Sequence, residues 1–202
     1  MSGKPALPEL DAVVLAGGDS RCMGSDKATL PFRGTTLVDA VAGVLAPMFR
    51  RVLVIAREPG LVTSANAEIL TDDRPLHGPL VGLARGLAHS GAPWCFVTAC
   101  DMPFVQPAVV LEMAAHLGDC DAVVPENGGR LQYLHAFYSQ SCLPRAEALL
   151  EQGSTSLRAL LSQCEVTQLD EDIFRHLPNA GQSFLDLDTT EEYRSALDDP
   201  SP

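Results

Sequence analysis

The chain has 202 residues, 46% of them hydrophobic and 20% charged, which is ordinary for one globular domain and excludes a wholly disordered or repetitive chain. Its 26 acidic residues outnumber its 14 basic residues, so a net charge of −12 argues against general binding to nucleic acid or to anionic membranes. The first ten residues lack the apolar run of a signal peptide, and no stretch approaches the ~18 apolar residues of a membrane span, so we expect a cytoplasmic protein.

Short apolar runs alternate with segments of helical periodicity along most of the chain. We expect residues 1–10 to form a flexible tail and residues 11–198 to form a single domain. Strands are predicted, in chain order, at 12–15, 52–56, 68–70, 94–98, 122–125, 134–138 and 165–169. The continuous apolar runs at 12–15 and 52–56 are typical of strands buried on both faces. Helices are predicted at 36–46, 79–89, 107–116, 143–152, 156–163 and 190–197. This alternation predicts an α/β fold with a mainly parallel sheet.

Polar segments that follow three of these strands are candidates for a binding site. In open α/β sheets, ligands bind at the carboxyl ends of the strands. That rule indicates the loop after Leu15, Asp72 after the third strand, and Cys100–Pro103 after the fourth. We therefore expect these three segments to meet at one edge of the sheet.

The segment from Leu15 to Lys27, which reads LAGGDSRCMGSDK, carries the strongest chemical signal. Its glycines let the backbone turn tightly and present N–H groups to a phosphate, while Arg21 and Lys27 supply positive charge. The spacing of a P-loop and the G-x-G-x-x-G dinucleotide fingerprint are both absent. The alternative is a flexible surface turn, but two cations directly after a core strand of an acidic protein favour phosphate binding.

Three further segments follow this loop in order. They are Asp72-Asp73-Arg74-Pro75 with Gly78-Pro79-Leu80-Val81-Gly82-Leu83, then Cys100-Asp101-Met102-Pro103-Phe104, then Gly129-Arg130-Leu131-Gln132-Tyr133-Leu134-His135-Ala136-Phe137-Tyr138. Together the four segments resemble the motifs of the molybdenum cofactor guanylyltransferases, over residues 12–197. The resemblance implies a three-layer Rossmann-like nucleotidyltransferase fold with a mainly parallel mixed sheet. It also implies Mg²⁺-dependent transfer of GMP from GTP to molybdopterin or to its molybdenum-loaded form.

The resemblance assigns roles to the residues that match the family motifs. Lys27, Asp101 and Arg21 would be catalytic, with Lys27 offsetting the charge of the leaving pyrophosphate. Asp101, at the carboxyl end of a predicted strand, would bind Mg²⁺, a hard ion that takes one or two carboxylates together with substrate phosphates. The nucleotide would be bound by Leu15, Ala16, Gly17, Gly18, Lys27, Asp72, Gly78 and Asp101. At Gly78 a helix begins, and its free N–H groups would favour an anion.

Three residues are candidates for the acceptor side of the site. His135 lies on a predicted strand that the family places near the second substrate, and a structural histidine is the alternative. Asp186 and Asp188 stand where the family tends to have asparagine, so they would bring two carboxylates towards a phosphorylated pterin. The implied partners are GTP and molybdopterin, with transient contacts to proteins of cofactor synthesis or to acceptor proteins.

Two other functions stay open at this point. A molybdopterin cytidylyltransferase would use CTP, and Ile55 stands where members that read guanine can have asparagine; however, those enzymes tend to read LAAG where this chain has LAGG. A non-catalytic nucleotide- or cofactor-binding module is suggested by the two aspartates near the C-terminus. Lys27 and Asp101 favour an enzyme over such a module, since both match the catalytic pattern.

Overall fold

Strand β1 (Leu7–Ala16) lies in the interior of the sheet, where it pairs in parallel with β4 (Phe49–Ala56) and with β6 (Trp94–Ala99). The structure is a computed structural model that describes residues 6–17 and 27–198. The strand order is β10-β7-β9-β6-β1-β4-β5. The remaining strands of this order are β5 (Glu68–Thr71), β7 (Ala122–Asn127), β9 (His135–Ser139) and β10 (Val166–Leu169). The short strand β8 (Arg130–Leu131) pairs with β7. β9 runs antiparallel to β6 and β7, and the short β8 runs antiparallel to β7, whereas the other pairs of this sheet are parallel. The prediction of a mainly parallel mixed sheet is therefore confirmed.

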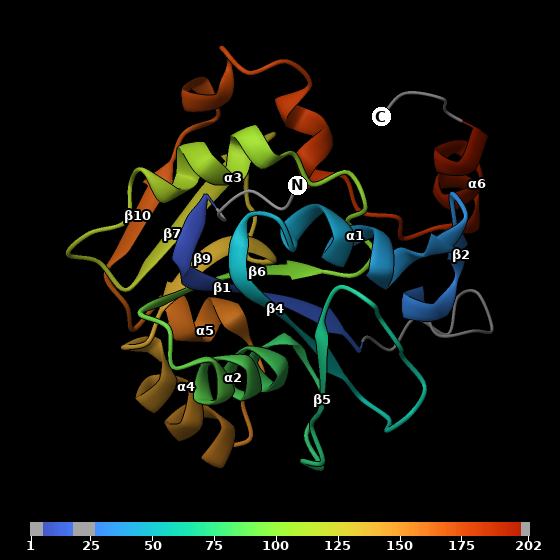
Figure 1. The fold of residues 1–202 in the computed structure, drawn as a ribbon. Coiled ribbons are helices and arrows are strands. Elements are labelled where there is room, and N and C mark those ends of the chain that lie inside the picture. The colour runs from blue at the N-terminus through green and yellow to red at the C-terminus, as the bar shows by residue number, and fades with distance from the viewer. Residues whose placement is uncertain (1–5, 18–26, 199–202) are drawn as a thin grey trace.

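Helices cover both faces of this sheet and make three layers (Figure 1). On one face lie α1 (Leu37–Leu45) and α3 (Pro107–Ala114), and on the other lie α2 (Pro79–Ser90), α4 (Cys142–Glu151) and α5 (Leu157–Leu161). To one side, α6 (Thr190–Asp198) packs near the hairpin of β2 (Pro31–Phe32) and β3 (Thr35–Thr36). Short 3-10 turns lie at η2 (Lys27–Thr29), η3 (Glu171–Phe174) and η4 (Ala180–Phe184). Within the described ranges, every helix falls short of the length and apolar content needed to cross a membrane.

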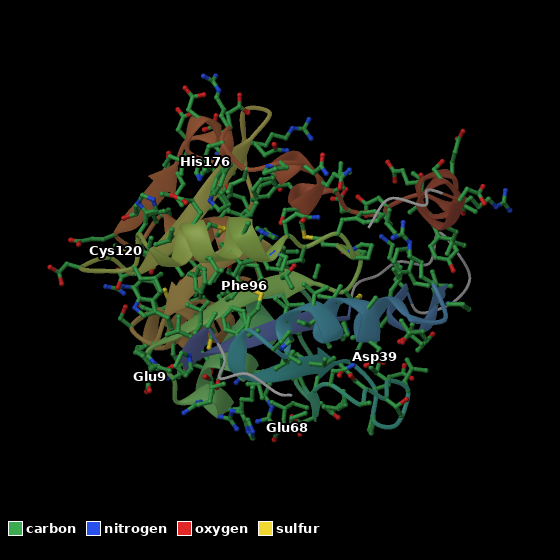
Figure 2. The ribbon with its side chains drawn as sticks, turned by 45° about the horizontal axis from the view of Figure 1, so that its top comes forward. Glu9, Asp39, Glu68, Phe96, Cys120 and His176 are labelled. Carbon is green, nitrogen blue, oxygen red and sulfur yellow. The ribbon has the colours of Figure 1, made fainter. Side chains whose placement is uncertain are left out.

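The apolar run of β1 fills two cores because alternate side chains of a strand point to opposite faces. Ala12 and Val14 pack in the core under α1 and α3, whereas Val13 and Leu15 pack in the core under α2, α4 and α5. Phe96 on β6 belongs to the first core and lies at the centre of the molecule in Figure 2, while Glu68 and His176 lie at its edges. The sheet is therefore buried on both faces, as continuous apolar strands require.

The expected N-terminal tail is wrong for residues 7–10. β1 begins at Leu7, whose N–H donates to the Met48 carbonyl at 2.7 Å, and Leu10 is only 8% exposed. The sequence did not predict this extension of the strand, because it contains Pro8 and Glu9, and proline and charged residues are unusual within a buried strand. Residues 1–5 lie outside the described part of the chain. The short strands β2, β3 and β8 were also missed, since two residues are too few to show a period.

Helix α2 approaches β1 closely through two glycines one turn apart. A Cβ at Gly86 would lie 2.8 Å and 2.9 Å from the two methyl carbons of Val13, and a Cβ at Gly82 would lie 2.8 Å from the end of the Leu15 side chain. Val13 is completely buried and stiff at χ1, whereas the end of a leucine side chain can turn aside. The two glycines thus set how near the helix lies to β1, the strand that precedes the glycine-rich segment.

Gly86→Ala should lower the free energy of unfolding by about 1–2 kcal/mol. Overpacking against a rigid valine costs about 1–3 kcal/mol, and the better helix propensity of alanine returns up to ~1 kcal/mol. Urea unfolding followed by circular dichroism measures the change. Gly82→Ala is the matched control and should cost less, because Leu15 can move; an equal or larger loss for Gly82→Ala would contradict this packing argument.

Candidate nucleotide site

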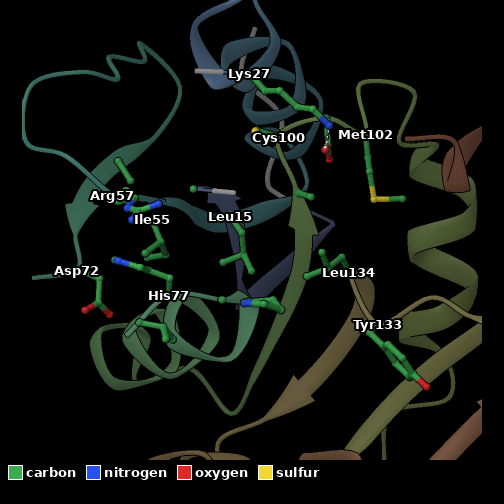
Figure 3. Close-up of a pocket in the computed structure, with 18 of the residues that line it drawn as sticks. Leu15, Lys27, Ile55, Arg57, Asp72, His77, Cys100, Met102, Tyr133 and Leu134 are labelled. Atoms are coloured by element: carbon green, nitrogen blue, oxygen red, sulfur yellow. Dashed lines mark hydrogen bonds and ion pairs between the residues drawn. The ribbon is translucent and has the colours of Figure 1, made fainter. Parts of the chain in front are cut away.

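A cavity of about 760 Å³ lies at the carboxyl ends of the parallel strands. From β1, the sheet continues to β4 and β5 on one side, and the chain then crosses to β6 on the other side of β1. Such a switch in direction leaves a crevice beyond the strand ends, where open α/β folds bind ligands. The cavity is lined there by the ends of β1, β4, β5 and β6, by the start of α2 and by the segment 132–134 (Figure 3).

Most of the residues expected to bind substrates line this cavity. They are Leu15, Gly17, Lys27, Asp72, Gly78, Asp101, Asp186 and Asp188. Ala16 is completely buried at the end of β1 and is not part of the cavity wall. The predictions for Gly18 and Arg21 lie outside the described residues. The three segments that sequence reasoning placed at one edge of the sheet, after Leu15, at Asp72 and at Cys100–Pro103, do meet there.

Lys27 is held between two carboxylates at one side of the cavity. Its Nζ lies 3.1 Å from Asp101 Oδ2 and 2.8 Å from Asp188 Oδ1, and its side chain is 8% exposed. Burial works against the charged form, but the pairing with Asp188 and Asp101 outweighs it and raises the pKa of Lys27. The side chain is therefore a positioned ammonium at neutral pH in the wall of the cavity.

The segment 186–188 is anchored to the site through its middle residue. Leu187 is 4% exposed and packs in a small core with Phe32, Leu37 and Ala196, and its N–H donates to the Asp101 carbonyl at 2.9 Å. Its two neighbours, Asp186 and Asp188, both line the cavity. Burial, and the charges of Asp188 and Asp101, raise the pKa of Asp186. The C-terminal part of the chain thus supplies two acids to a site that begins at β1.

Asp72 lies on the opposite side of the cavity from Lys27 (Figure 3). Its side chain is 8% exposed, and its Oδ1 accepts from the Arg74 N–H at 2.9 Å. Among the described residues, its buried Oδ2 has no hydrogen-bond partner. The adjacent Asp73 is exposed. Leaving a buried carboxylate oxygen without a donor is costly, which makes Asp72 a candidate hydrogen-bond acceptor at this side of the cavity.

The expected anion site at the start of α2 needs correction. Pro79 has no N–H, the Leu80 N–H donates to the Thr155 carbonyl at 3.2 Å, and the Val81 N–H donates to the Gly78 carbonyl at 3.1 Å. The first donors of the helix are therefore already used. Gly78 is needed for a different reason: its φ is +140°, and a Cβ there would lie 2.7 Å from the Thr155 side chain.

The predicted acceptor contact of His135 is wrong. Its side chain has no exposed surface and packs edge-on against Phe96 and Phe184, with Nε2 3.2 Å from the Ser183 hydroxyl. Burial lowers its pKa to about 3, so the imidazole is neutral. It is the structural histidine of the alternative interpretation. The single sequence cannot separate the two roles, since both place a histidine on a buried strand.

Two cations of the cavity wall were missed by sequence reasoning. Arg57 follows β4 directly, and Arg74 stands two residues beyond Asp72, so both lie at carboxyl ends of strands. Arg74 forms an ion pair with Glu147 at 3.0 Å and lies 3.9 Å from Asp72. Their position relative to the strands was the signal that could have found them. They add positive charge on the Asp72 side of the cavity.

Comparison with known proteins agrees with this fold and site. Residues 12–170 match the family described as the MobA-like NTP transferase domain. The molybdenum cofactor guanylyltransferase of Desulfosudis oleivorans is 32% identical over 192 residues, covering 94% of this chain and 95% of that protein. The probable molybdenum cofactor guanylyltransferase of Mycobacterium avium is 36% identical over 179 residues, covering 85% and 90%.

A solved structure shares the whole architecture. The molybdopterin-guanine dinucleotide biosynthesis protein A of Archaeoglobus fulgidus superposes with a TM-score of 0.80 at 25% identity, covering 93% of this chain and 96% of that one. The fold and the site therefore define a nucleotidyltransferase enzyme. The chain belongs to the MobA-like NTP transferase family, as its four motifs indicated. A purely non-catalytic module is not supported by these relatives.

Proposed function

We propose that this enzyme transfers GMP from GTP to molybdopterin, forming the guanine dinucleotide cofactor and pyrophosphate. The observation that carries the proposal is one cavity with a buried ammonium, Lys27, at one side and a buried acceptor without a partner, Asp72 Oδ2, at the other. The first suits a polyphosphate and the second suits the donor groups of a nucleoside. The names of the relatives from Desulfosudis oleivorans and Mycobacterium avium support the guanylyl assignment.

The proposed reaction requires the protein to position two anionic substrates. A phosphate oxygen of the acceptor attacks the α-phosphorus of the nucleotide, a new P–O bond forms, and the bond to the β-phosphate breaks as pyrophosphate leaves. Lys27 would hold the phosphates and offset the charge that grows on the leaving group. No side chain needs to form a covalent intermediate.

The carboxylates beside Lys27 fit a magnesium ion. Within the described residues, no cluster of three metal-ligating side chains is arranged to hold an ion unaided. Mg²⁺ does not require one, because it binds through one or two carboxylates together with substrate phosphates and water. Asp101, with a side chain 19% exposed at the end of β6, would be the protein ligand. When bound with the triphosphate, the ion would neutralise charge on the phosphate oxygens.

Guanine selection would rest on Asp72, since Ile55 stands at the comparable place for an asparagine and cannot hydrogen bond through its side chain. A carboxylate accepts only, and guanine presents two adjacent donors on its Watson–Crick edge, N1–H and the 2-amino group. Cytosine presents an amino donor beside an acceptor and matches less well. Leu134 and Tyr133 line the side of the cavity away from Asp72, and we place the acceptor there (Figure 3).

The test is a thermal-shift panel with Mg²⁺ and GTP, CTP, ATP or UTP, followed by pyrophosphate release with molybdopterin as acceptor. GTP should raise the melting temperature most, since a ligand at ~100 times its dissociation constant adds about 2.7 kcal/mol. Asp72→Ala should weaken GTP binding roughly 10- to 100-fold, because it removes a hydrogen bond to a charged group.

Asp73→Ala is the matched control, because Asp73 is the exposed neighbour of Asp72 on the same cavity wall. It should leave GTP binding within about two-fold, as substitutions on an exposed surface usually have small effects. Selective stabilisation by CTP would move the assignment to cytidylyl transfer. Equal losses for Asp72→Ala and Asp73→Ala would remove the role given to the buried oxygen.

A further inference from the structure

The two carboxylates that hold Lys27 differ in how firmly they are fixed. Asp101 follows β6 directly, its side chain is 19% exposed, and its carbonyl is bound by the Leu187 N–H. Asp188 makes the shorter contact to Lys27, at 2.8 Å against 3.1 Å, yet its side chain is 66% exposed. A change of side-chain rotamer is enough to release Asp188 into solvent, whereas Asp101 is held within the wall.

The backbone on both sides of Asp188 is fixed, which confines such a change to the side chain. Leu187 is buried, and the Thr189 N–H and hydroxyl both donate to Glu192, at 2.8 Å and 2.9 Å. The Glu192 N–H in turn donates to the Thr189 hydroxyl at 3.1 Å, so the residue after Asp188 caps α6. The carboxylate of Asp188 can therefore turn away from Lys27 while the backbone on both sides keeps its position.

We propose that Asp188 is a resident counter-ion of Lys27 that an incoming polyphosphate must displace, so that this residue sets the affinity of the site for its nucleotide. The inference rests on the proposed function, which places the phosphates at Lys27. Asp188 stands where, by resemblance, the family tends to have asparagine, which carries no charge.

The excess of acidic residues in the cavity strengthens the effect of competition between Asp188 and a polyphosphate for Lys27. Among the described lining residues, six acids face three basic side chains; the acids are Glu58, Asp72, Asp73, Asp101, Asp186 and Asp188, and the bases are Lys27, Arg57 and Arg74. A polyphosphate entering this site gains most binding free energy from Lys27, the most deeply buried of these three basic side chains. While Asp188 holds that ammonium, the polyphosphate must replace an existing ion pair and does not gain a new one in full.

Other roles for Asp188 lead to the opposite result. If Asp188 bound the acceptor or a metal ion, removing its charge would leave phosphate binding unchanged or would weaken it. If it acted only through the general field of the cavity, Asp186 would act equally, since it lies two residues away and also lines the cavity. The counter-ion role alone singles out Asp188 and predicts tighter binding once its charge is removed.

The experiment measures the affinity of inorganic tripolyphosphate for the full chain by isothermal titration calorimetry, with EDTA present so that no divalent cation contributes. Asp188→Asn should bind about two- to five-fold tighter than the wild type, the range expected for loss of one exposed ion pair. Asp186→Asn is the matched control and should change the affinity less. Raising the salt concentration should reduce the effect of Asp186→Asn more than that of Asp188→Asn, because contact pairs are screened less than distant charges.

An unchanged or weaker affinity for Asp188→Asn, or an equal gain for Asp186→Asn, would overturn the inference. The probe has neither base nor acceptor, so this result is separate from the nucleotide panel. If the panel shows no preference for GTP while Asp188→Asn binds tripolyphosphate more tightly, the guanylyl assignment is wrong and the counter-ion role of Asp188 is supported. If the panel favours GTP and Asp188→Asn binds tripolyphosphate no more tightly than the wild type, only the counter-ion role of Asp188 is wrong.

Discussion

Lys27→Ala should lower the rate of nucleotidyl transfer about 10²- to 10³-fold, the usual loss when one positioned charge that stabilises a transition state is removed. The ammonium is buried between Asp101 and Asp188, so its position is fixed before substrate binds. Without it, the two carboxylates would repel the phosphates of the nucleotide. The measurement is kcat and KM for pyrophosphate release with GTP and molybdopterin.

Two controls separate loss of chemistry from loss of fold. The unliganded variant should melt cooperatively, since Lys27 lies at the cavity wall and outside the two main cores. Lys27→Arg keeps the charge but spreads it over a planar fork, so it should recover only part of the rate. Turnover within two-fold of the wild type in Lys27→Ala, with normal GTP binding, would show that another group carries the charge.

Asp11→Asn should lower the free energy of unfolding by about 2–4 kcal/mol, towards the low end of what breaking a buried ion pair costs. The Asp11 side chain is completely buried at the end of the sheet opposite the site. It accepts hydrogen bonds from Arg50 at 2.9 Å, from Arg51 at 3.1 Å and from the Ser90 hydroxyl at 2.6 Å. The arginines are partly exposed and can turn to water, which keeps the loss below the full range.

The pH dependence gives this prediction a second readout. Burial opposes ionisation of Asp11, but its hydrogen bonds from Arg50, Ser90 and Arg51 outweigh burial and lower its pKa. A lowered pKa contributes stability above the unfolded-state value, about 3.9, and this contribution is lost as the pH falls below that value. The difference between wild type and Asp11→Asn in urea unfolding should be constant from pH 5 to 7 and shrink below about pH 4.

Glu68→Gln is the control for Asp11→Asn, because Glu68 pairs with the same Arg51 but on the surface. Its loss should stay below about 1 kcal/mol, as for exposed ion pairs. If Glu68→Gln destabilised the protein as much as Asp11→Asn, the burial of the carboxylate would not be the cause.

The sequence predicted the sheet and most of the site because both follow from continuous apolar strands. The runs at Ala12 and Val52 are typical of strands buried on both faces, and the rule for strand ends then brought Asp72 and Asp101 to one edge. The same rule, applied to every strand, would also have found Arg57. Here the local pattern and the tertiary position agree.

The remaining errors have a common physical cause: they depend on contacts between distant segments. The role of Gly78 comes from Thr155, the burial of His135 comes from Phe184, and the partner of Lys27 comes from residue 188. Each of these partners lies more than 45 residues away in the chain. A local pattern cannot show such a partner, so the motif was found but the contact that explains it was not.

The ion pairs of Lys27 also bear on when the enzyme becomes competent during its synthesis. Its partners are 74 and 161 residues further along the chain, although the strands β1, β4, β5 and β6 that frame the cavity are complete at residue 99. Domains fold as their segments emerge from the ribosome, and contacts of long sequence separation form late. A nascent chain that ends before residue 186 can form that part of the sheet and already contains Asp101, but it lacks Asp188, the second partner of the lysine, so the cavity wall is completed only when the segment before the last helix has been made.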